Sequence, residues 1–505
     1  MHTMLISLMY TVSFLFTLII SIKLYYSNRS TTNKNPPPSP PTFPVIGNLH
    51  QLSPLIHRSF LSLSNRYGPH LMLLHLGSVP SLVVSSSEAA QEIMQTYDHE
   101  FASKPNIKIF KTIFYDSKEV AVAPYGEEWR QAKKNLVLHY ASAKAVQMFS
   151  TIRDQEIALT INEIKDLISC NKVVNLSEVI SEHTNGVSCR ATFGRKYNSG
   201  EAGRKFKQVS QNLLEVVTHF YFADSIPQLA WIDKISGANA KADRVAEFMD
   251  EFLEGAIEER IAKTDLDVCE GVEPFIDALL RIHKEGVKGR SFNRSAIKAN
   301  LMDAYLGGTD TVSALSEWVM TELLAHPSSL KKVQEEVRTV VKGKEYITEE
   351  DIEQMNYLKA VITETARLHP PVPVPPSRVA TQDSKVMGFD IAKGTRIYVN
   401  IWAIGRDPKV WDKPDEFMPD RFVESSVNLV KHDFKIIPFG GGRRGCPGRV
   451  FGMAVVENLL ANLLCKFDWA LPDGVKEDSV NMEEAFGLTS HKKIQLLATA
   501  KPFTM

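Results

Sequence analysis

The stretch PFGGGRRGCPGRVFG, from Pro438 to Gly452, crowds six glycines, three arginines and two prolines around one cysteine, Cys446. Glycine loses more conformational entropy on folding than any other residue, so such a run needs a structural reason. Glycines allow tight turns and a close approach of the backbone to a flat ligand, and the helical pattern from Arg449 onward places Cys446 just before a helix N-terminus. Unpaired N–H groups there favour a thiolate. We therefore interpret Cys446 as a thiolate presented to a ligand, whereas Cys465, in the apolar pattern ANLLCKF, fits a buried and inert cysteine.

The charge balance and the cysteine count exclude several classes of protein. The 505 residues include 58 basic and 59 acidic side chains, a formal net charge of -1. This balance argues against nucleic acid as a partner, because phosphate binding needs a basic surface. The five cysteines are odd in number and widely spaced, unlike a disulfide framework or a zinc site built from paired cysteines. We therefore expect a reduced compartment.

An uncharged stretch of 20 residues, Thr3 to Ile22, lies near the N-terminus. As a helix it would reach about 30 Å, the thickness of a bilayer core. We predict that residues 1–23 form a transmembrane anchor; a cleaved signal peptide is the alternative, which the lack of a small-x-small site disfavours. Lys23, Arg29 and Lys34 follow the stretch, so the positive-inside rule places the N-terminal tip in the lumen and the rest of the chain in the cytosol.

The next segment, residues 24–41, is basic and rich in proline. Proline favours an extended polyproline conformation that cannot continue a helix. We interpret this segment as a stiff hinge between membrane and body, with a disordered linker as the alternative. The folded body is expected to span residues 42–505.

Helical periodicity dominates that body. Apolar residues recur at three- and four-residue spacing in SEAAQEIMQTY, RDQEIALTINEIKDLI, RVAEFMDEFLEGAIEERI, AVVENLLANLLCKF and the run from Asn300 to Ala325. Strand patterns occur early, in HLMLLHLGSVPSLVVSS, and late, in KVMGFDIAKGTRIYVNIWAIG, where Ala392, Lys393 and Gly394 supply a predicted hairpin turn. No repeat or second linker interrupts the pattern. We predict one large, mainly α domain with small β-sheets (α+β).

The cysteine loop carries a resemblance to a known family. Phe439, Gly442, Arg444, Cys446 and Gly448 fit the pattern F-x-x-G-x-R-x-C-x-G. In this respect the chain resembles the cytochrome P450 family, in which the loop supplies the axial thiolate of a haem iron. The resemblance implies a P450 fold, a haem b cofactor bound by this loop and Cys446 as the iron ligand.

A second matching motif is GGTDT, Gly307 to Thr311, inside the long helical pattern. Two glycines in a helix interior cost about 1 kcal/mol each relative to alanine, so local stability does not explain them. In the P450 family this spot lies over the haem, and the acid–alcohol pair, here Asp310 and Thr311, relays protons to bound oxygen. A helix kink with a hydrogen-bonded threonine is the structural alternative.

A third motif, ETAR, contains Glu364 and Arg367 three residues apart on one predicted helix face. In the family these two residues meet the arginine of a downstream PERF element. Here the element reads PDRF, so Arg421 is the counterpart and Asp420 replaces the commoner glutamate. The resemblance implies a buried structural network of two arginines and one carboxylate.

The motif WRQAKK contributes Trp129 and Lys133. By resemblance, Trp129, Lys133, Arg378 and Arg444 bind the two haem propionates. The family usually has arginine at the position of Lys133, and a lysine makes a point-charge contact in place of a fork.

The resemblance is closest to plant microsomal P450s of the A-type group. It implies a monooxygenase in the endoplasmic reticulum membrane that uses O2, with electrons from NADPH by way of a separate P450 reductase. Arg130, Lys134, Lys431 and Arg443 offer positive charge for docking that reductase, although ordinary solvated surface is an equal alternative for each residue.

The resemblance also places a substrate pocket, whose expected lining is mostly apolar or aromatic. The lining is taken from residues 101–122 and 219–227 and from Ala304, Gly307, Val372, Val374, Phe486 and Leu488. Such a pocket suits a hydrophobic plant metabolite, namely a terpenoid, phenylpropanoid or terpene-derived alkaloid, with hydroxylation as the default reaction. The alternatives are a P450-fold isomerase or dehydratase that works without O2, and a haem-binding protein without catalysis.

Overall fold

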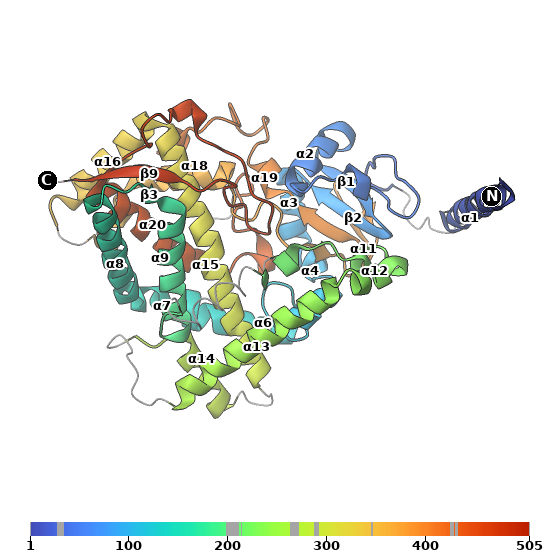
Figure 1. Ribbon diagram of the computed structural model, residues 1–505, viewed down its shortest axis with the longest axis horizontal. Coiled ribbons are helices and arrows are strands. Elements are labelled where there is room, and N and C mark those ends of the chain that lie inside the picture. The colour runs from blue at the N-terminus through green and yellow to red at the C-terminus, as the bar shows by residue number, and fades with distance from the viewer. Residues whose placement is uncertain are drawn as a thin grey trace.

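Helices make up most of the molecule, and the short strands lie in separate places, with β1 and β2 at one side and β3 and β9 at the other (Figure 1). The computed structural model describes residues 2–27, 35–197, 212, 213, 215–262, 272–286, 292–344, 347–424, 429 and 433–503. The fold class predicted from the sequence, mainly α with small sheets, is confirmed.

The described helices of the N-terminal half are α1 (His2–Ser27), α2 (Ile56–Tyr67), α3 (Ser87–Gln91), α4 (Asp98–Phe101), α5 (Lys108–Ile113), α6 (Glu127–Leu136), α7 (Ala143–Met148), α8 (Ser150–Ser169), α9 (Leu176–Phe193), α11 (Phe222–Ser225) and α12 (Ala230–Ile235). Those that follow are α13 (Ala238–Ala262), α14 (Phe275–Glu285), α15 (Arg294–Ala325), α16 (Pro327–Val341), α17 (Glu349–Glu353), α18 (Asn356–Leu368), α19 (Ile401–Ile404) and α20 (Arg449–Lys466). Short 3-10 turns include η5 (Pro419–Phe422) and η6 (Gly442–Arg444).

The strands are β1 (Leu71–Leu76), β2 (Val79–Val84), β3 (Val174–Asn175), β4 (Arg378–Val379), β5 (Ser384–Val386), β6 (Phe389–Ile391), β7 (Arg396–Val399), β8 (Phe467–Ala470) and β9 (Leu497–Pro502). The largest sheet has the order β1-β2-β7-β4. In it, β1 and β2 form an antiparallel hairpin with Leu71 opposite Val84, and β7 joins β2 in parallel with Ser81 opposite Arg396. The remaining sheets have the orders β3-β9-β8 and β5-β6.

The late hairpin turn was predicted at the wrong place. The turn between paired strands lies at Met387 and Gly388, both with positive φ, and joins β5 to β6. The chain through Ala392 to Gly394 instead leads into β7, which pairs with β2 and β4. Turn residues alone do not show whether the strand that follows them pairs with the strand just before the turn or with a strand from a distant part of the sequence.

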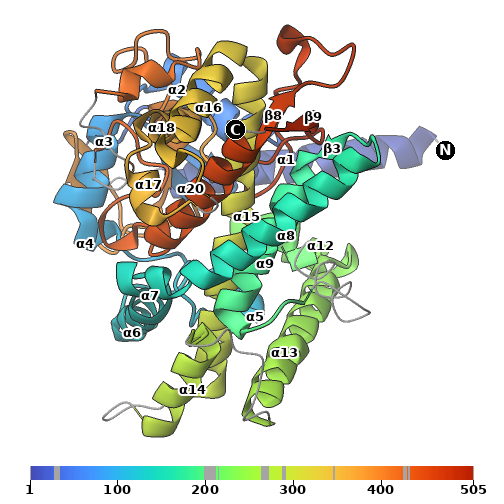
Figure 2. The same cartoon turned by 90° about the vertical axis from the view of Figure 1, so that its left-hand side faces the viewer.

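Helix α15 is the central element of the helical region. It is apolar around much of its circumference, as expected for a helix buried on several sides, and it packs against α9, α20, α18 and α14. The side chain of Asn293 accepts a hydrogen bond from Ala296 N and caps its N-terminus. Figure 2 shows α15 behind α8 and α9, with α20 and α18 on one side of it.

The proline-rich segment is attached to the body from Asn35 onward. Asn35 N donates to Asp390 Oδ2 at 2.9 Å, and Asp390 N donates to Asn35 O at 2.8 Å. Leu73 N of β1 donates to Pro38 O at 2.8 Å. Composition predicted that the folded body begins at Thr42, but the body already binds the chain from Asn35 onward. It can do so because the carbonyls of a polyproline segment remain free to accept hydrogen bonds.

No helix in the part of the chain that the structure describes is long and apolar enough to cross a membrane. Of the predicted anchor, residues 1–23, all but Met1 lie in the described helix α1, and its role in a membrane stays a prediction. In Figure 1, α1 stands apart from the body on the side where β1, β2, α11 and α12 lie.

Candidate active site

The cysteine loop turns tightly between η6 and the start of α20. Cys446 N donates to Phe439 O at 2.9 Å, and Gly445 N donates to Gly442 O at 3.0 Å. Gly442 has φ +66°, and a Cβ there would lie 2.0 Å from Met94 O. Glycine at position 442 is thus required both by the backbone conformation and by the close contact with the π-helical turn η2 (Glu92–Thr96), which contains Met94.

Cys446 lies deep in the molecule and yet is exposed. Desolvation raises the pKa of its thiol, although the N–H of Gly448 and the charges of Lys133 and Arg449 act in the opposite direction. The sequence argument considered only the helix terminus and missed this desolvation. Because the thiol is exposed, it can bind a metal cation, and such a cation would deprotonate it.

The two glycines of α15 face different surroundings. A Cβ on Gly308 would lie 3.0 Å from both Phe451 Cε1 and Tyr140 Oη, so a larger residue there would crowd these two side chains. Gly307 is exposed, and a Cβ at that position would meet nothing within 4 Å. Helices α15 and α20 are in contact, with Val312 Cγ2 3.6 Å from the place of a Cβ on Gly452, so the helix that carries Gly307 packs on the helix that follows Cys446.

Cations from three elements converge beside this loop. The guanidinium of Arg444 lies 4.3 Å from the ring of Trp129, and its Nε donates to Ala102 O at 2.6 Å. Lys133 Nζ donates to Arg443 O at 2.6 Å and also lies over Trp129, at 5.2 Å. Arg378 Nη2 donates to Gly441 O at 2.7 Å. Desolvation lowers the pKa of all three cations, that of Arg444 to about 10.

This cluster fits a ligand that carries carboxylates. Lys133 and Arg444 are half-buried and Arg378 is buried, and of the three Arg378 pairs with a carboxylate, that of Asp98, at 3.2 Å. Buried cations are costly unless anions pair with them, and an anionic ligand would offset that cost. Trp129 itself offers no free donor, because its Nε1 donates to Val120 O at 3.0 Å. Its ring instead supports Arg444 and Lys133. Of the four predicted propionate partners, the three cations fit the group and Trp129 serves as their platform.

The two residues of the acid–alcohol pair, Asp310 and Thr311, make hydrogen bonds to different partners. Thr311 Oγ1 donates to Gly307 O at 2.8 Å. The carboxylate of Asp310 accepts at 2.8 Å from His491 Nε2, which comes from the C-terminal part of the chain. Desolvation would raise the pKa of Asp310, but the hydrogen bond and charge of His491 outweigh it and lower the pKa.

Comparison with known proteins identifies the family. Residues 37–498 match the cytochrome P450 family. The chain is 44% identical to cytochrome P450 736A117 of Prunus mume, over 96% of this chain and 94% of that protein. It is 41% identical to a 3-beta-hydroxylase of Tanacetum parthenium, over 96% of each chain. The chain belongs to the cytochrome P450 family. It is thus a plant P450 monooxygenase, an oxidoreductase of a haem-containing family.

A solved structure has the same fold. A zebrafish cytochrome P450 crystallised with progesterone superimposes with a TM-score of 0.75 at 24% identity, covering 88% of this chain and 99% of that one. Identity this low supports the fold and carries no inference about substrate.

The Glu364 network of this P450 is buried and fully hydrogen-bonded. Arg367 donates to Glu364 twice, at 2.7 and 2.8 Å, and Arg421 Nε donates to Glu364 Oε1 at 3.1 Å. Glu364 is 0% and Arg367 1% exposed. Removal of one member would leave a buried charge unpaired, at a cost of roughly 3 to 5 kcal/mol. Asp420 lies outside this network and pairs with Lys332 at the surface.

Sequence reasoning missed two residues of this site. Asp98 on α4 is buried; its Oδ1 accepts from Arg378 at 3.2 Å, and its Oδ2 accepts from Arg443 N at 3.0 Å. Lys104 donates to Pro376 O at 2.5 Å, and desolvation, followed by repulsion from Arg378 and Arg444, lowers its pKa. Neither lies in a recognisable motif, and both become visible only when the chain brings distant segments together.

The expected pocket residues lie in unequal surroundings. Phe486 is 61% exposed, whereas Ala304 is 2% and Val374 9% exposed. Val374 packs in the apolar cluster of the β1-β2 side, so its side chain contributes to that core. Val372 and Leu488 are half-buried, and Ser490 N donates to Pro371 O at 2.8 Å, which joins their two segments. Phe439 and Gly448 are also half-buried beside the cysteine.

Proposed function

We propose that this P450 holds haem b with Cys446 as the axial thiolate and inserts one oxygen atom of O2 into a hydrophobic plant metabolite, most simply as a C–H hydroxylation. The observation that carries the proposal is the exposed Cys446, in a tight glycine-rich loop that leads into α20, the helix on which α15 with Gly307 packs. When bound, the haem supplies the oxygen activation.

The residues of this chain have separate roles around that group. The cations of Lys133, Arg378 and Arg444 would bind the propionates, and the lack of a side chain at Gly307 leaves room for a diatomic ligand. Thr311 Oγ1 can hold a proton and pass it on, since its present acceptor is only the backbone oxygen of Gly307. Asp310 is the acid nearest to it along α15.

Electrons are proposed to come from NADPH through P450 reductase at the face that carries the cysteine loop. Arg130 and Lys134 on α6 are exposed there, as is Arg443. Arg130 already pairs with Glu127 and Arg443 with Asp98, so Lys134 offers the freest charge of the three. Lys431 lies outside the described residues.

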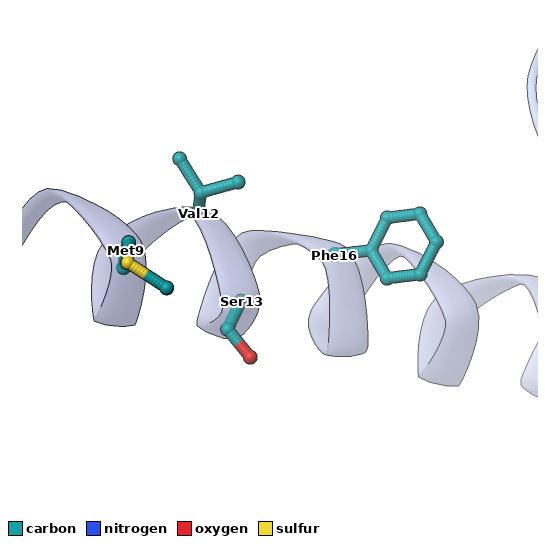
Figure 3. A pocket seen from close by; sticks show the side chains of 4 residues that line it. All are labelled: Met9, Val12, Ser13 and Phe16. Atoms are coloured by element: carbon teal, nitrogen blue, oxygen red, sulfur yellow. The ribbon is translucent and has the colours of Figure 1, made fainter.

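We further propose that the protein resides in the endoplasmic reticulum membrane through residues 1–23, with the body in the cytosol. Figure 3 shows Met9, Val12, Ser13 and Phe16 along a shallow hollow on α1, away from the active site; the three apolar side chains among them are 59 to 70% exposed. Such side chains need lipid or protein to cover them.

An exposed apolar face on the body supports the same orientation. Trp231 and Ile235 on α12 are 57% and 77% exposed, and Phe43 is 55% exposed. The turn after β1 connects these places, because Gly77 N donates to Ile46 O and Ser78 N donates to Ser225 O. This face would lie against the bilayer surface.

The substrate is proposed to be a terpenoid, phenylpropanoid or terpene-derived alkaloid. The exposed Phe486, the open side of Gly307 and the half-buried Val372 and Leu488 offer mostly apolar contacts. The 3-beta-hydroxylase relative supports a hydroxylation.

The first test is replacement of Cys446 by serine in the full-length protein. We expect the variant to lose the carbon monoxide difference band that thiolate ligation gives a reduced haem, and to lose NADPH- and O2-dependent oxidation. A variant that kept the band would contradict the proposal. NADPH consumption by the unaltered protein with a bound substrate separates a monooxygenase from an isomerase or dehydratase.

A further inference from the structure

Residues 483–493 form a hairpin, here called the C-terminal hairpin, that joins the pocket to α15. Ala485 N donates to His491 O at 2.8 Å, and Lys493 N donates to Glu483 O at 2.9 Å. The exposed Phe486 lies near its tip. One side chain of this hairpin, His491, reaches α15 beside Thr311.

His491 lies between two carboxylates of α15. Its Nε2 is 2.8 Å from Asp310 Oδ1, and its Nδ1 is 3.9 Å from Glu317 Oε2. Ser177 of α9 donates to the other oxygen of Glu317. The other charged group next to it is Lys492, whose Nζ is directed to Asn481 O. Two carboxylates thus face the ring, and the neighbouring Lys492 is directed to a backbone oxygen, so the site favours the imidazolium form.

A second histidine–carboxylate pair on α15 provides an internal comparison. His369 Nε2 is 2.7 Å from Glu322 Oε1, and the histidine stacks on Trp318 at 4.0 Å. The side chains of that pair are 9% and 6% exposed, whereas those of His491 and Asp310 are 31% and 24% exposed. The first pair is sealed in the core, and the second remains open to proton exchange.

We propose that His491 is the positioning residue that holds Asp310 as an oriented, ionised carboxylate, so that Asp310 can accept a proton and pass it towards Thr311. This inference rests on the proposed function. A carboxylate that relays protons must be deprotonated before it can accept one. A neighbouring imidazolium favours this deprotonated form. The second oxygen of Asp310, Oδ2, is buried and makes no hydrogen bond of good geometry in the described structure; Thr489 is the other side chain that, with His491, stabilises the carboxylate, so Oδ2 is the oxygen placed to accept the proton.

The electrostatics agree with this geometry. Desolvation lowers the pKa of His491, but the hydrogen bonds and charges of Asp310 and Glu317 outweigh it and raise the pKa to about 10. Without the histidine, desolvation would act on Asp310 unopposed by this cation and would raise the pKa of the carboxyl.

The test compares His491→Gln with His491→Arg, which keeps a cation, and with His369→Gln, which disturbs the sealed pair. The direct readout is the infrared carbonyl band of a protonated Asp310, identified by its disappearance in Asp310→Asn backgrounds. We expect no such band at neutral pH in the unaltered protein or in His369→Gln. In His491→Gln the band appears and titrates between about pH 5 and 8, and His491→Arg removes it again.

A functional readout accompanies the spectrum. With NADPH and reductase, the fraction of electrons recovered as hydrogen peroxide should be nearly constant over this pH range in the unaltered protein. In His491→Gln it should rise at least about twofold as the pH falls, because a protonated Asp310 cannot accept the next proton. A peroxide fraction that responds equally in His369→Gln would show a merely structural effect and overturn the assignment.

Two further outcomes decide the matter if His491→Gln does not fold. A band of protonated Asp310 in the unaltered protein at neutral pH would overturn the proposal. If the band is absent both from the unaltered protein and from His491→Arg, the proposal is supported. The infrared titration needs no turnover. Failure of the protein to consume O2 would therefore count against the proposed function and leave the result for His491 readable.

Discussion

The glycines of the cysteine loop are needed for different structural reasons. Gly440 and Gly442 have the same φ, +66°, which disfavours any residue with a Cβ. A Cβ on Gly440 would meet nothing within 4 Å, whereas one on Gly442 would collide with Met94 O and Asp98 Oδ1. The motif thus contains one position set by backbone conformation alone and one set by conformation and packing together.

This difference gives a matched pair of variants. Gly440→Ala should cost only the left-handed strain, about 1 to 2 kcal/mol, and should retain haem. Gly442→Ala adds a backbone collision, so we expect a loss of several kcal/mol and little haem incorporation. Haem content and thermal unfolding of the two purified variants measure the difference. Equal behaviour would mean that the loop can shift away from α4.

At the scale of elements, buried charge pairs attach the loops to the helices. Glu484, at the base of the C-terminal hairpin, is 2.9 Å from His57 Nε2 and 3.1 Å from Arg58 Nε, both on α2. His491 attaches the other strand of the hairpin to α15. The hairpin that carries Phe486 is therefore held at both sides of its base, while Phe486 itself is exposed.

The pair on α2 predicts a pH dependence of stability. Desolvation raises the pKa of Glu484, but His57 and Arg58 outweigh it and lower the pKa to about 2. Because the folded pKa lies below the ordinary value of 4.5, the stabilisation is present above that value and is lost as the pH falls towards 2. Urea unfolding between about pH 3.5 and 6 should show a steeper loss for the unaltered protein than for Glu484→Gln. Identical slopes would contradict this assignment.

At the scale of the whole molecule, the body and the N-terminal helix are separable. The body holds the chain from Asn35 through the Asp390 and Leu73 hydrogen bonds, and none of these involves α1. Figure 1 shows α1 outside the body. The fold and the haem site are therefore expected to survive without the segment proposed as the anchor.

Deletion of residues 1–23 tests this separation. We expect the truncated protein to fold and bind haem, and to keep part of its affinity for phospholipid vesicles through the exposed Trp231 and Ile235. Replacing these two residues by serine in the truncated protein should abolish the remaining vesicle flotation. Complete loss of binding on truncation alone would show that the face of α12 does not contact lipid.

The sequence alone determined the features that depend on short-range pattern. Periodicity predicted α8, α13, α15 and α20, and the spacing around Cys446 pointed to the family and the site. By resemblance, the sequence also predicted a network of Glu364, Arg367 and Arg421. The structure brings these three side chains together. Such signals survive in one sequence because the interacting residues lie close along the chain or in fixed motifs.

The tertiary structure alone decided which distant groups meet. Asp98 binds the cysteine loop at Arg443, Lys104 reaches Pro376 O, His491 binds the carboxylate of Asp310, and β7 pairs with β2 in place of β6. None of these contacts leaves a local pattern, because each depends on segments far apart in the sequence. The energies of these groups also depend on burial. Desolvation by the surrounding atoms raises the pKa of the Cys446 thiol, and only the tertiary packing sets how large this desolvation is.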